Sequence, residues 1–346
     1  MTAAADAPLL IVGCPRSGTT LAATLLESRF GFAVPAETQF IPYFARAIGL
    51  WGDLSNPANR HLLLDAVFQF LEIWVARALP AIARDTILPQ TLLSVRPDAQ
   101  AIVAGASSYA DLVRGLFEAY ARRHGRARWA EKSAYATPVS LDALERVFPG
   151  MRIVHLVRDP RDVCLSWRKT DTPPPSLAGG ARLWRWHLRA SRAWGAANGQ
   201  RYLEIRYEDL ALAPTATVDR LGGFLGTPPS PTPAESALAR VMQEFPSQAQ
   251  LASPILGRSV GLWLDHLAPE DVRTIESIAS ADMAATGHQT SGQRPNLATL
   301  VQRELSRAAP LIRGVSWRRG AKILLPLAIR LAQYAGQHLP ARLAIR

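Results

Sequence analysis

The sequence predicts a three-layer α/β fold built around a central parallel sheet. Residues 9–12, Leu-Leu-Ile-Val, form an unbroken apolar run that is typical of a buried parallel strand. A glycine-containing loop follows, and leucines at helical spacing over residues 21–26 predict the next helix. Residues 151–157 predict another strand, again followed by a loop and then by a helix from Val163. Two strand–loop–helix units favour parallel strands joined by helical crossovers.

The length and composition of the chain suit one large domain with additions. The chain has 346 residues, 48% apolar and 19% charged, so it can bury a sizeable core. We expect the main domain to cover residues 1–290, with a helical elaboration between about residues 40 and 127. Residues 291–346 form a predicted extension that is basic and partly amphipathic. Its helical pattern from Trp317 suits an anionic membrane surface, a partner, or packing back onto the domain.

Charge and hydropathy limit the classes of function. No run of about 18 uncharged apolar residues occurs, so we predict no membrane span. The N-terminus lacks a basic segment before its short apolar run, and we expect a cytoplasmic protein, or one peripheral at the inner membrane face through its extension. The formal net charge of +11 suits an anionic ligand, a nucleic acid or an anionic membrane. Cys14 and Cys164 are the only cysteines, which favours two small core residues over a disulfide framework or a metal site.

The loop from Gly13 to Thr20, GCPRSGTT, is a predicted anion cradle. A loop between a strand end and a helix start presents backbone N–H groups and the positive end of the helix dipole. Its spacing resembles a P-loop, but Thr19 stands where nucleotide triphosphatases have a lysine, and the cation comes earlier, as Arg16. ATP or GTP hydrolysis is therefore disfavoured. The candidate binding residues of this loop are Arg16, Ser17, Gly18, Thr19 and Thr20.

A second anion cradle is predicted after residues 151–157. The sequence Arg-Asp-Pro-Arg-Asp follows the strand, so a basic loop again lies between a strand end and a helix start. His155 lies inside the predicted strand, where we interpret it as a core histidine.

Two further charged side chains follow predicted strands. Glu37 lies 21 residues after Arg16, and we expect its strand to lie next to the strand of residues 9–12 because the two are consecutive. The alternative is a surface Glu that caps the next helix. Lys132 lies near the end of the predicted strand Arg128–Ser133, and it is one of only three lysines in the chain. The alternative for Lys132 is a solvated loop lysine.

Together these motifs resemble those of the sulfotransferases that use 3′-phosphoadenosine 5′-phosphosulfate (PAPS). The resemblance covers about residues 8–265 and is nearer to the bacterial and tyrosylprotein branch. It rests on PRSGTTL in the first loop, AETQFIP, which contains Glu37, WAEKS with Pro138, and RDPRDVCLS, which begins with the second loop. Two later segments also match: RYEDL, which contains Tyr207, and Gly257–Trp263, which contains Arg258 and Ser259.

The resemblance implies a transferase that moves the sulfuryl group of PAPS to a hydroxyl acceptor and releases adenosine 3′,5′-bisphosphate. It implies that the first loop binds the 5′-phosphosulfate, that Arg158 and Ser166 bind the 3′-phosphate, and that Tyr207 contacts the nucleotide. Arg258 or Ser259 would close the site. Glu37 would be the general base, Arg16 and Lys132 would stabilise the leaving group, and no metal would be required. Position 21 is Leu where the cytosolic enzymes carry a Trp that stacks on adenine, so the stacking residue is unassigned.

Two other classes of function compete with this interpretation. A P-loop kinase predicts a lysine after the second glycine, which the chain lacks. A nucleic-acid-binding protein predicts basic clusters interleaved with exposed aromatics, whereas the arginines here are scattered, so we expect no nucleic-acid partner. The acceptor stays open among lipid, glycan, phenol and peptide hydroxyls, with an apolar or lipid-linked compound as one candidate. Four aromatics, Trp51, Phe68, Phe70 and Trp74, suit either an acceptor pocket or, as we favour, ordinary core.

Overall fold

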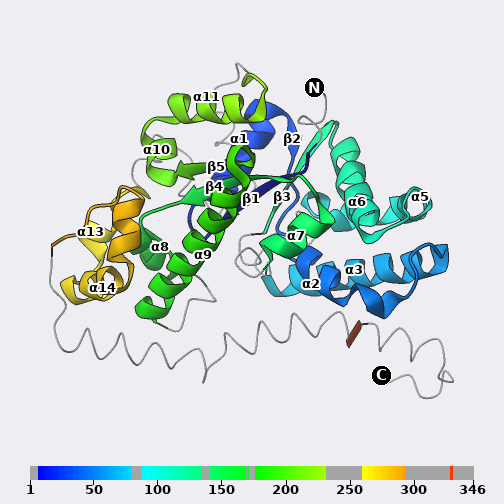
Figure 1. Ribbon diagram of the computed structural model, residues 1–346, viewed down its shortest axis with the longest axis horizontal. Coiled ribbons are helices and arrows are strands. Elements are labelled where there is room, and N and C mark those ends of the chain that lie inside the picture. Colours follow the sequence, from blue (N-terminus) through cyan, green and yellow to red (C-terminus); the bar gives the residue numbers. More distant parts are fainter. Residues whose placement is uncertain are drawn as a thin grey trace. The chain divides into compact units, whose positions relative to one another are not determined.

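The computed structural model describes most of the chain up to residue 292 (Figure 1). Contacts between residues divide the chain into two compact units, here called the first and the second unit. The described residues are 7–78, 87–133, 140–168, 170, 176–230, 259–292 and 328–329. The first unit comprises Met1–Phe32, Lys132–Leu141 and Gly150–Arg313, and the second comprises Ala33–Glu131, Asp142–Pro149 and Gly314–Arg346.

A five-stranded sheet lies at the centre of the fold (Figure 1). Strand β1 (Leu9–Gly13) pairs in parallel with β4 (Arg152–Val157), which pairs in parallel with β5 (Tyr202–Arg206). The full order is β2-β3-β1-β4-β5, where β2 is Phe32–Ala33 and β3 is Arg128–Lys132. Every residue of β1 is buried, as its apolar run predicts. The central parallel sheet confirms the predicted α/β fold.

The strand order corrects one expectation. The strand that precedes Glu37 was expected next to the strand of residues 9–12, but β3 occupies that position. With only two residues, β2 is too short to pair along the length of β1, whereas β3 has five. The loops after β1 and β4 lie at the same edge of the sheet, because Gly13 is in register with Leu156 between parallel strands.

Two groups of helices belong to the first unit. Helix α1 (Thr19–Phe30) packs against α11 (Pro214–Leu225), where Gly222 lies close to the Phe30 ring. Helices α8 (Pro160–Trp167), α9 (Leu177–Asn198) and α14 (Pro269–Ala285) share one apolar cluster. The unit also contains α10 (Tyr207–Leu212) and the short α13 (Trp263–His266).

Helix α8 begins three residues earlier than the predicted start at Val163. Asp159 caps it by accepting a hydrogen bond from the Arg161 N–H, and Pro160 occupies the first helical position. Trp184 of α9 donates its indole N–H to the Arg158 carbonyl oxygen at 2.9 Å, which fixes the loop before α8. His155 is buried and bonded to the Tyr202 hydroxyl at 2.6 Å, as expected for a core histidine.

The second unit is helical over the region predicted as an elaboration. Trp51, Phe68 and Phe70 are at most 1% exposed, which confirms them as core, and Trp51 stacks on Phe44 with ring centroids 5.3 Å apart. Its α-helices are α2 (Ile41–Ala47), α3 (Pro57–Ala78), α5 (Ala99–Ala104), α6 (Tyr109–Arg123) and α7 (Leu141–Val147). Its 3₁₀ helices are Ile48–Trp51, Leu88–Gln90 and Leu92–Asp98.

Some predictions fall outside the described residues. Arg258 and Pro138 are among them, as is the extension except for residues 291–292 and 328–329. Within the described part of the chain, no helix is both long and apolar enough to cross a membrane. Cys14 and Cys164 are both buried free thiols.

Candidate functional site

The first loop, residues 13–20, owes its shape to unusual backbone angles. Gly13, Arg16 and Gly18 have φ angles of 156°, 75° and 95°. A Cβ at Gly13 would lie 2.6 Å from the Leu156 carbonyl oxygen, so only glycine fits beside β4. The Ser17 N–H closes the turn by donating to the Cys14 carbonyl at 3.0 Å. A non-glycine residue at positive φ, as at Arg16, is strained and is a common feature of binding loops.

Some polar groups at the start of α1 lack partners among the described residues. Gly18 is the N-cap residue, and no described side chain caps the helix there. Ser17 is 1% exposed, and within the described part of the chain its Oγ has no hydrogen-bond partner. A buried hydroxyl without a partner is uncommon and needs an explanation. Lys132, at the end of β3, donates its Nζ to the Thr20 Oγ1 at 3.5 Å.

Arg158 connects the second loop, residues 158–162, to two other segments. Its Nη1 donates to the Arg16 carbonyl at 3.2 Å, and its Nη2 donates to the Ser259 carbonyl at 2.6 Å. The guanidinium carbon lies 4.4 Å from the centre of the Tyr207 ring. Its Nε is buried and has no hydrogen-bond partner among the described residues. Arg158 is thus held in place, and its Nε donor is unpaired among the described residues.

Tyr207 and Ser166 complete the contacts between the loops. A Cβ at Gly18 would lie 2.5 Å from the Tyr207 ring, so the ring packs directly on the first loop. Arg16 donates its Nε to the Ser166 Oγ at 3.0 Å. Most of the predicted site residues therefore lie in the first unit: Arg16, Ser17, Gly18, Thr19, Thr20, Lys132, Arg158, Ser166, Tyr207 and Ser259.

Glu37 belongs to the second unit, whereas these residues belong to the first. It lies beyond β2 in a segment without regular secondary structure, and its Oε2 accepts a hydrogen bond from Gln39 Nε2 at 3.1 Å. The neighbouring Thr38 donates to the buried Glu131 carboxylate at 2.9 Å. Gln39 has a φ of 59°, so the backbone here is also unusual.

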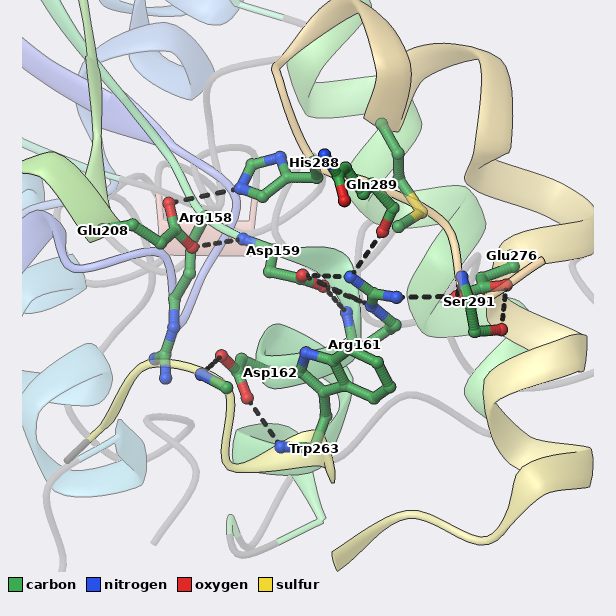
Figure 2. Close-up of polar contacts among 12 residues, drawn as sticks. Arg158, Asp159, Arg161, Asp162, Glu208, Trp263, Glu276, His288, Gln289 and Ser291 are labelled. Atoms are coloured by element: carbon green, nitrogen blue, oxygen red, sulfur yellow. Dashed lines mark hydrogen bonds and ion pairs between the residues drawn. The ribbon is translucent and has the colours of Figure 1, made fainter. Parts of the chain in front are cut away.

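The sequence analysis missed a buried ionic network around the second loop (Figure 2). Arg161 is 4% exposed and pairs with both Asp159 and Glu276 at 2.7 Å. Asp162 accepts hydrogen bonds from the backbone N–H groups of residues 261 and 263. Burial raises the pKa of Asp162, although these N–H groups and Arg158 act in the opposite direction. The sequence could have indicated this network, because the RDPRD motif contains Asp159, Arg161 and Asp162.

Glu208 and His288 continue this network. Glu208 accepts a hydrogen bond from the Asp159 N–H at 2.9 Å and lies 3.2 Å from His288 Nε2. Burial raises the pKa of Glu208, but His288 and the backbone N–H outweigh it, so the net pKa is lowered. A cavity of about 340 Å³ adjoins the network, lined by Asp159, Arg161, Asp162, Arg206, Glu208, Val260, Gly261, Trp263, Gly287, His288, Gln289, Thr290 and Ser291. No described group of three or more His, Cys, Asp or Glu side chains is placed to hold a metal ion.

The protein has an α/β fold. Two loops of the type that binds anions lie at the same edge of its sheet. Residues 8–231, more than half of the chain, match the model of the sulfotransferase family. The chain therefore belongs to the sulfotransferase family, and the protein is an enzyme of that class.

Two solved sulfotransferase domains share this fold, and a third solved sulfotransferase is a weaker structural match. The sulfotransferase domain of the Synechococcus PCC 7002 olefin synthase is 22% identical with a TM-score of 0.52, over 80% of this chain and 95% of that one. The sulfotransferase domain of the curacin biosynthetic pathway is 18% identical with a TM-score of 0.52, over 82% and 98%. Mouse sulfotransferase SULT7A1, solved in complex with PAP, is 12% identical with a TM-score of 0.42, over 88% and 89%. No curated protein sequence matches the chain significantly.

Proposed function

We propose that the protein transfers the sulfuryl group of PAPS to a hydroxyl acceptor and releases adenosine 3′,5′-bisphosphate. The observation that carries this proposal is the pair of buried polar atoms without described partners, Ser17 Oγ and Arg158 Nε, one in each loop. A buried donor without a partner costs about 1–3 kcal/mol, and the oxygens of a nucleotide would pair both atoms. Membership of the sulfotransferase family supports sulfuryl transfer as the reaction.

In this proposal the first loop binds the 5′-phosphosulfate. Backbone N–H groups at the start of α1 suit an anion, since no described side chain caps them. The side chains of Arg16, Ser17, Thr19 and Thr20 add donors at the same helix end. The glycine at position 18 lets the backbone approach the ligand closely.

The 3′-phosphate is assigned to Arg158 and Ser166, with Ser259 or Arg258 closing the site. Arg16 contacts Ser166, and Arg158 contacts the carbonyl oxygens of Arg16 and Ser259, so these contacts link the four residues and support this assignment. Tyr207 is assigned to the nucleotide, which its packing on Gly18 supports.

The chemistry depends on positioning and charge, as in phosphoryl transfer. The donor supplies an activated sulfuryl group. Arg16 and Lys132 stabilise negative charge on the departing oxygen, a role that the 3.5 Å contact of Lys132 with Thr20 supports. Glu37 accepts the proton of the acceptor hydroxyl, which is typically worth about 10²–10⁴-fold in rate. The proposal assigns no role to a metal.

A binding experiment tests the donor. Adenosine 3′,5′-bisphosphate should raise the melting temperature, whereas ATP with Mg²⁺ and an oligonucleotide should not. This comparison separates a sulfotransferase from a kinase and from a nucleic-acid-binding protein.

Arg158→Ala should weaken bisphosphate binding by about 2–4 kcal/mol in calorimetry, because a charge-assisted contact is lost. Arg168→Ala is the matched control, since Arg168 is 44% exposed and pairs with Asp271. Equal affinity in both variants would remove Arg158 from the site.

A kinetic experiment tests the base. Glu37→Gln keeps the size of the side chain and its hydrogen-bonding capacity but removes basicity, so kcat should fall by about 10²-fold or more with bisphosphate affinity unchanged. Glu118→Gln, on the exposed face of α6, is the control. Glu37 does not cap α2, whose N-cap residue is Phe40, so a lower melting temperature with near-normal kcat would instead assign Glu37 a structural role through its contact with Gln39. In that case His61 and His266 are the next candidates for the base.

The acceptor and the location of the enzyme are parts of the proposal that need separate experiments. A screen of lipid, glycan, phenol and peptide hydroxyls with labelled PAPS would assign the acceptor, for which an apolar or lipid-linked compound is one candidate. We also propose a cytoplasmic enzyme whose basic segment from residue 317 contacts anionic membranes. Truncation at about residue 315 should then abolish vesicle binding and leave bisphosphate binding intact, because every phosphate motif precedes it.

A further inference from the structure

The segment of residues 259–263, here called the late segment, is fastened to the second loop by three side chains. We propose that Asp162 is a positioning residue that holds the late segment against Arg158 and so completes the 3′-phosphate site. The inference rests on the proposed function. It concerns a residue that need not touch the nucleotide itself.

The carboxylate of Asp162 binds the backbone of the late segment at two points (Figure 2). Its Oδ2 accepts a hydrogen bond from the Gly261 N–H at 2.8 Å, and its Oδ1 accepts one from the Trp263 N–H at 2.9 Å. Asp162 is 2% exposed, so these are buried, charge-assisted hydrogen bonds. Gly261 has a φ of 75°, and the chain turns between the two contacts.

Arg161 contacts the late segment through the side chain of Trp263. Its guanidinium carbon lies 3.6 Å from the centre of the Trp263 ring. Arg161 is itself fixed by Asp159 and Glu276, and by the Gln289 carbonyl at 2.9 Å (Figure 2). Trp263 is therefore held at its backbone by one residue of the second loop and at its ring by another.

The third contact leads to the proposed ligand site. Arg158 donates Nη2 to the carbonyl of Ser259, which is 8% exposed and stands two residues before Gly261. Displacement of residues 261–263 would thus move the Ser259 carbonyl oxygen, whose hydrogen bond orients the Arg158 guanidinium. Both Asp162 oxygens are occupied by backbone N–H groups, and a carboxylate would repel a phosphate at close range. The Asp162 charge also interacts directly with Arg158, but its loss would by itself favour a bound phosphate, so weaker 3′-phosphate binding in a neutral variant reports the late segment.

The substitution Asp162→Asn tests this role. It keeps the size of the side chain but places an NH₂ group against one of the two backbone N–H groups. The measured quantity is the ratio of affinities for adenosine 3′,5′-bisphosphate and adenosine 5′-monophosphate, by calorimetry. We expect the ratio to fall by about 10-fold, because only the bisphosphate uses the 3′-phosphate site. A general loss of stability would lower both affinities together and leave the ratio unchanged. Asp265→Asn, an exposed acid in α13, is the matched control and should behave as wild type.

The outcomes separate this inference from the proposed function. If the wild-type protein binds the bisphosphate no better than the monophosphate, the proposed function fails. If the wild type prefers the bisphosphate and Asp162→Asn keeps the same preference, only the inference fails. Should Asp162→Asn not fold, amide hydrogen exchange of the wild-type protein tests the same role at the Gly261 and Trp263 N–H groups that Asp162 binds. Both should exchange more slowly with saturating adenosine 3′,5′-bisphosphate than with saturating adenosine 5′-monophosphate, and equal rates with the two nucleotides would overturn the inference.

Discussion

The two loops at the edge of the sheet reach their shapes by different means. The first loop is shaped by its backbone, with positive φ at Gly13, Arg16 and Gly18 and no described side chain capping α1. The second loop is shaped by side chains, because Asp159 caps α8 and Arg161 lies between two buried acids. The first therefore leaves main-chain donors available for a ligand. The second uses most of its polar groups within the protein.

This difference predicts different sensitivities. A backbone-shaped loop should be intolerant of any added Cβ and indifferent to pH. A loop held by carboxylates should tolerate small changes of volume but respond to their protonation. Substitutions in each loop can test this contrast.

The largest effect is expected at Gly18. An alanine there would be strained at a φ of 95° and would place its Cβ 2.5 Å from the Tyr207 ring. Gly18→Ala should lower the free energy of unfolding by about 2–4 kcal/mol and abolish measurable bisphosphate binding. Urea unfolding and calorimetry on one preparation measure both quantities.

The control for Gly18 is Gly223→Ala. Gly223 lies within α11 with nothing within 4 Å of an added Cβ, so alanine should be neutral or stabilise by up to about 1 kcal/mol. Equal stabilities of the two variants would contradict a backbone-shaped first loop.

A smaller effect is expected at Glu208, which holds the second loop through the Asp159 N–H. Glu208→Gln should cost about 1–3 kcal/mol at pH 7, because a buried charge-assisted contact is weakened. Its pKa is lowered in the folded protein, so its contribution to stability is complete above the ordinary value of 4.5 and is lost as the pH falls through the lowered pKa.

Urea unfolding at a series of pH values measures this contribution. The difference in stability between wild type and Glu208→Gln should shrink as the pH falls below about 4.5. The exposed Glu118→Gln should show no such pH-dependent difference. A difference between wild type and Glu208→Gln that stays constant from pH 7 to pH 3 would exclude the carboxylate as the group that holds the second loop.

The local parts of the fold could be predicted from the sequence. Apolar runs gave β1 and β4, and the GCPRSGTT and RDPRD patterns gave the two loops, because each is decided by neighbouring residues. The position of β3 between β1 and β2 could not be predicted, since strand pairing joins residues far apart in the chain. Asp162 shows the same limit within the site, because its partner Gly261 lies 99 residues away. The residues next to a buried acid in the sequence do not indicate which distant backbone N–H groups it will bind.

The packing of Tyr207 on Gly18, beneath Arg158, has a consequence for folding kinetics. The contacts that build the loops join residues 142 and 150 positions apart, as in Arg158 with Arg16 and Arg16 with Ser166. Contacts of such high sequence separation form late, after the entropy of closing long loops has been overcome. The nascent chain cannot assemble this arrangement until β5 and Tyr207 have been synthesised. A chain released before that point would have the strand β1 and its loop but no tyrosine ring to pack against Gly18.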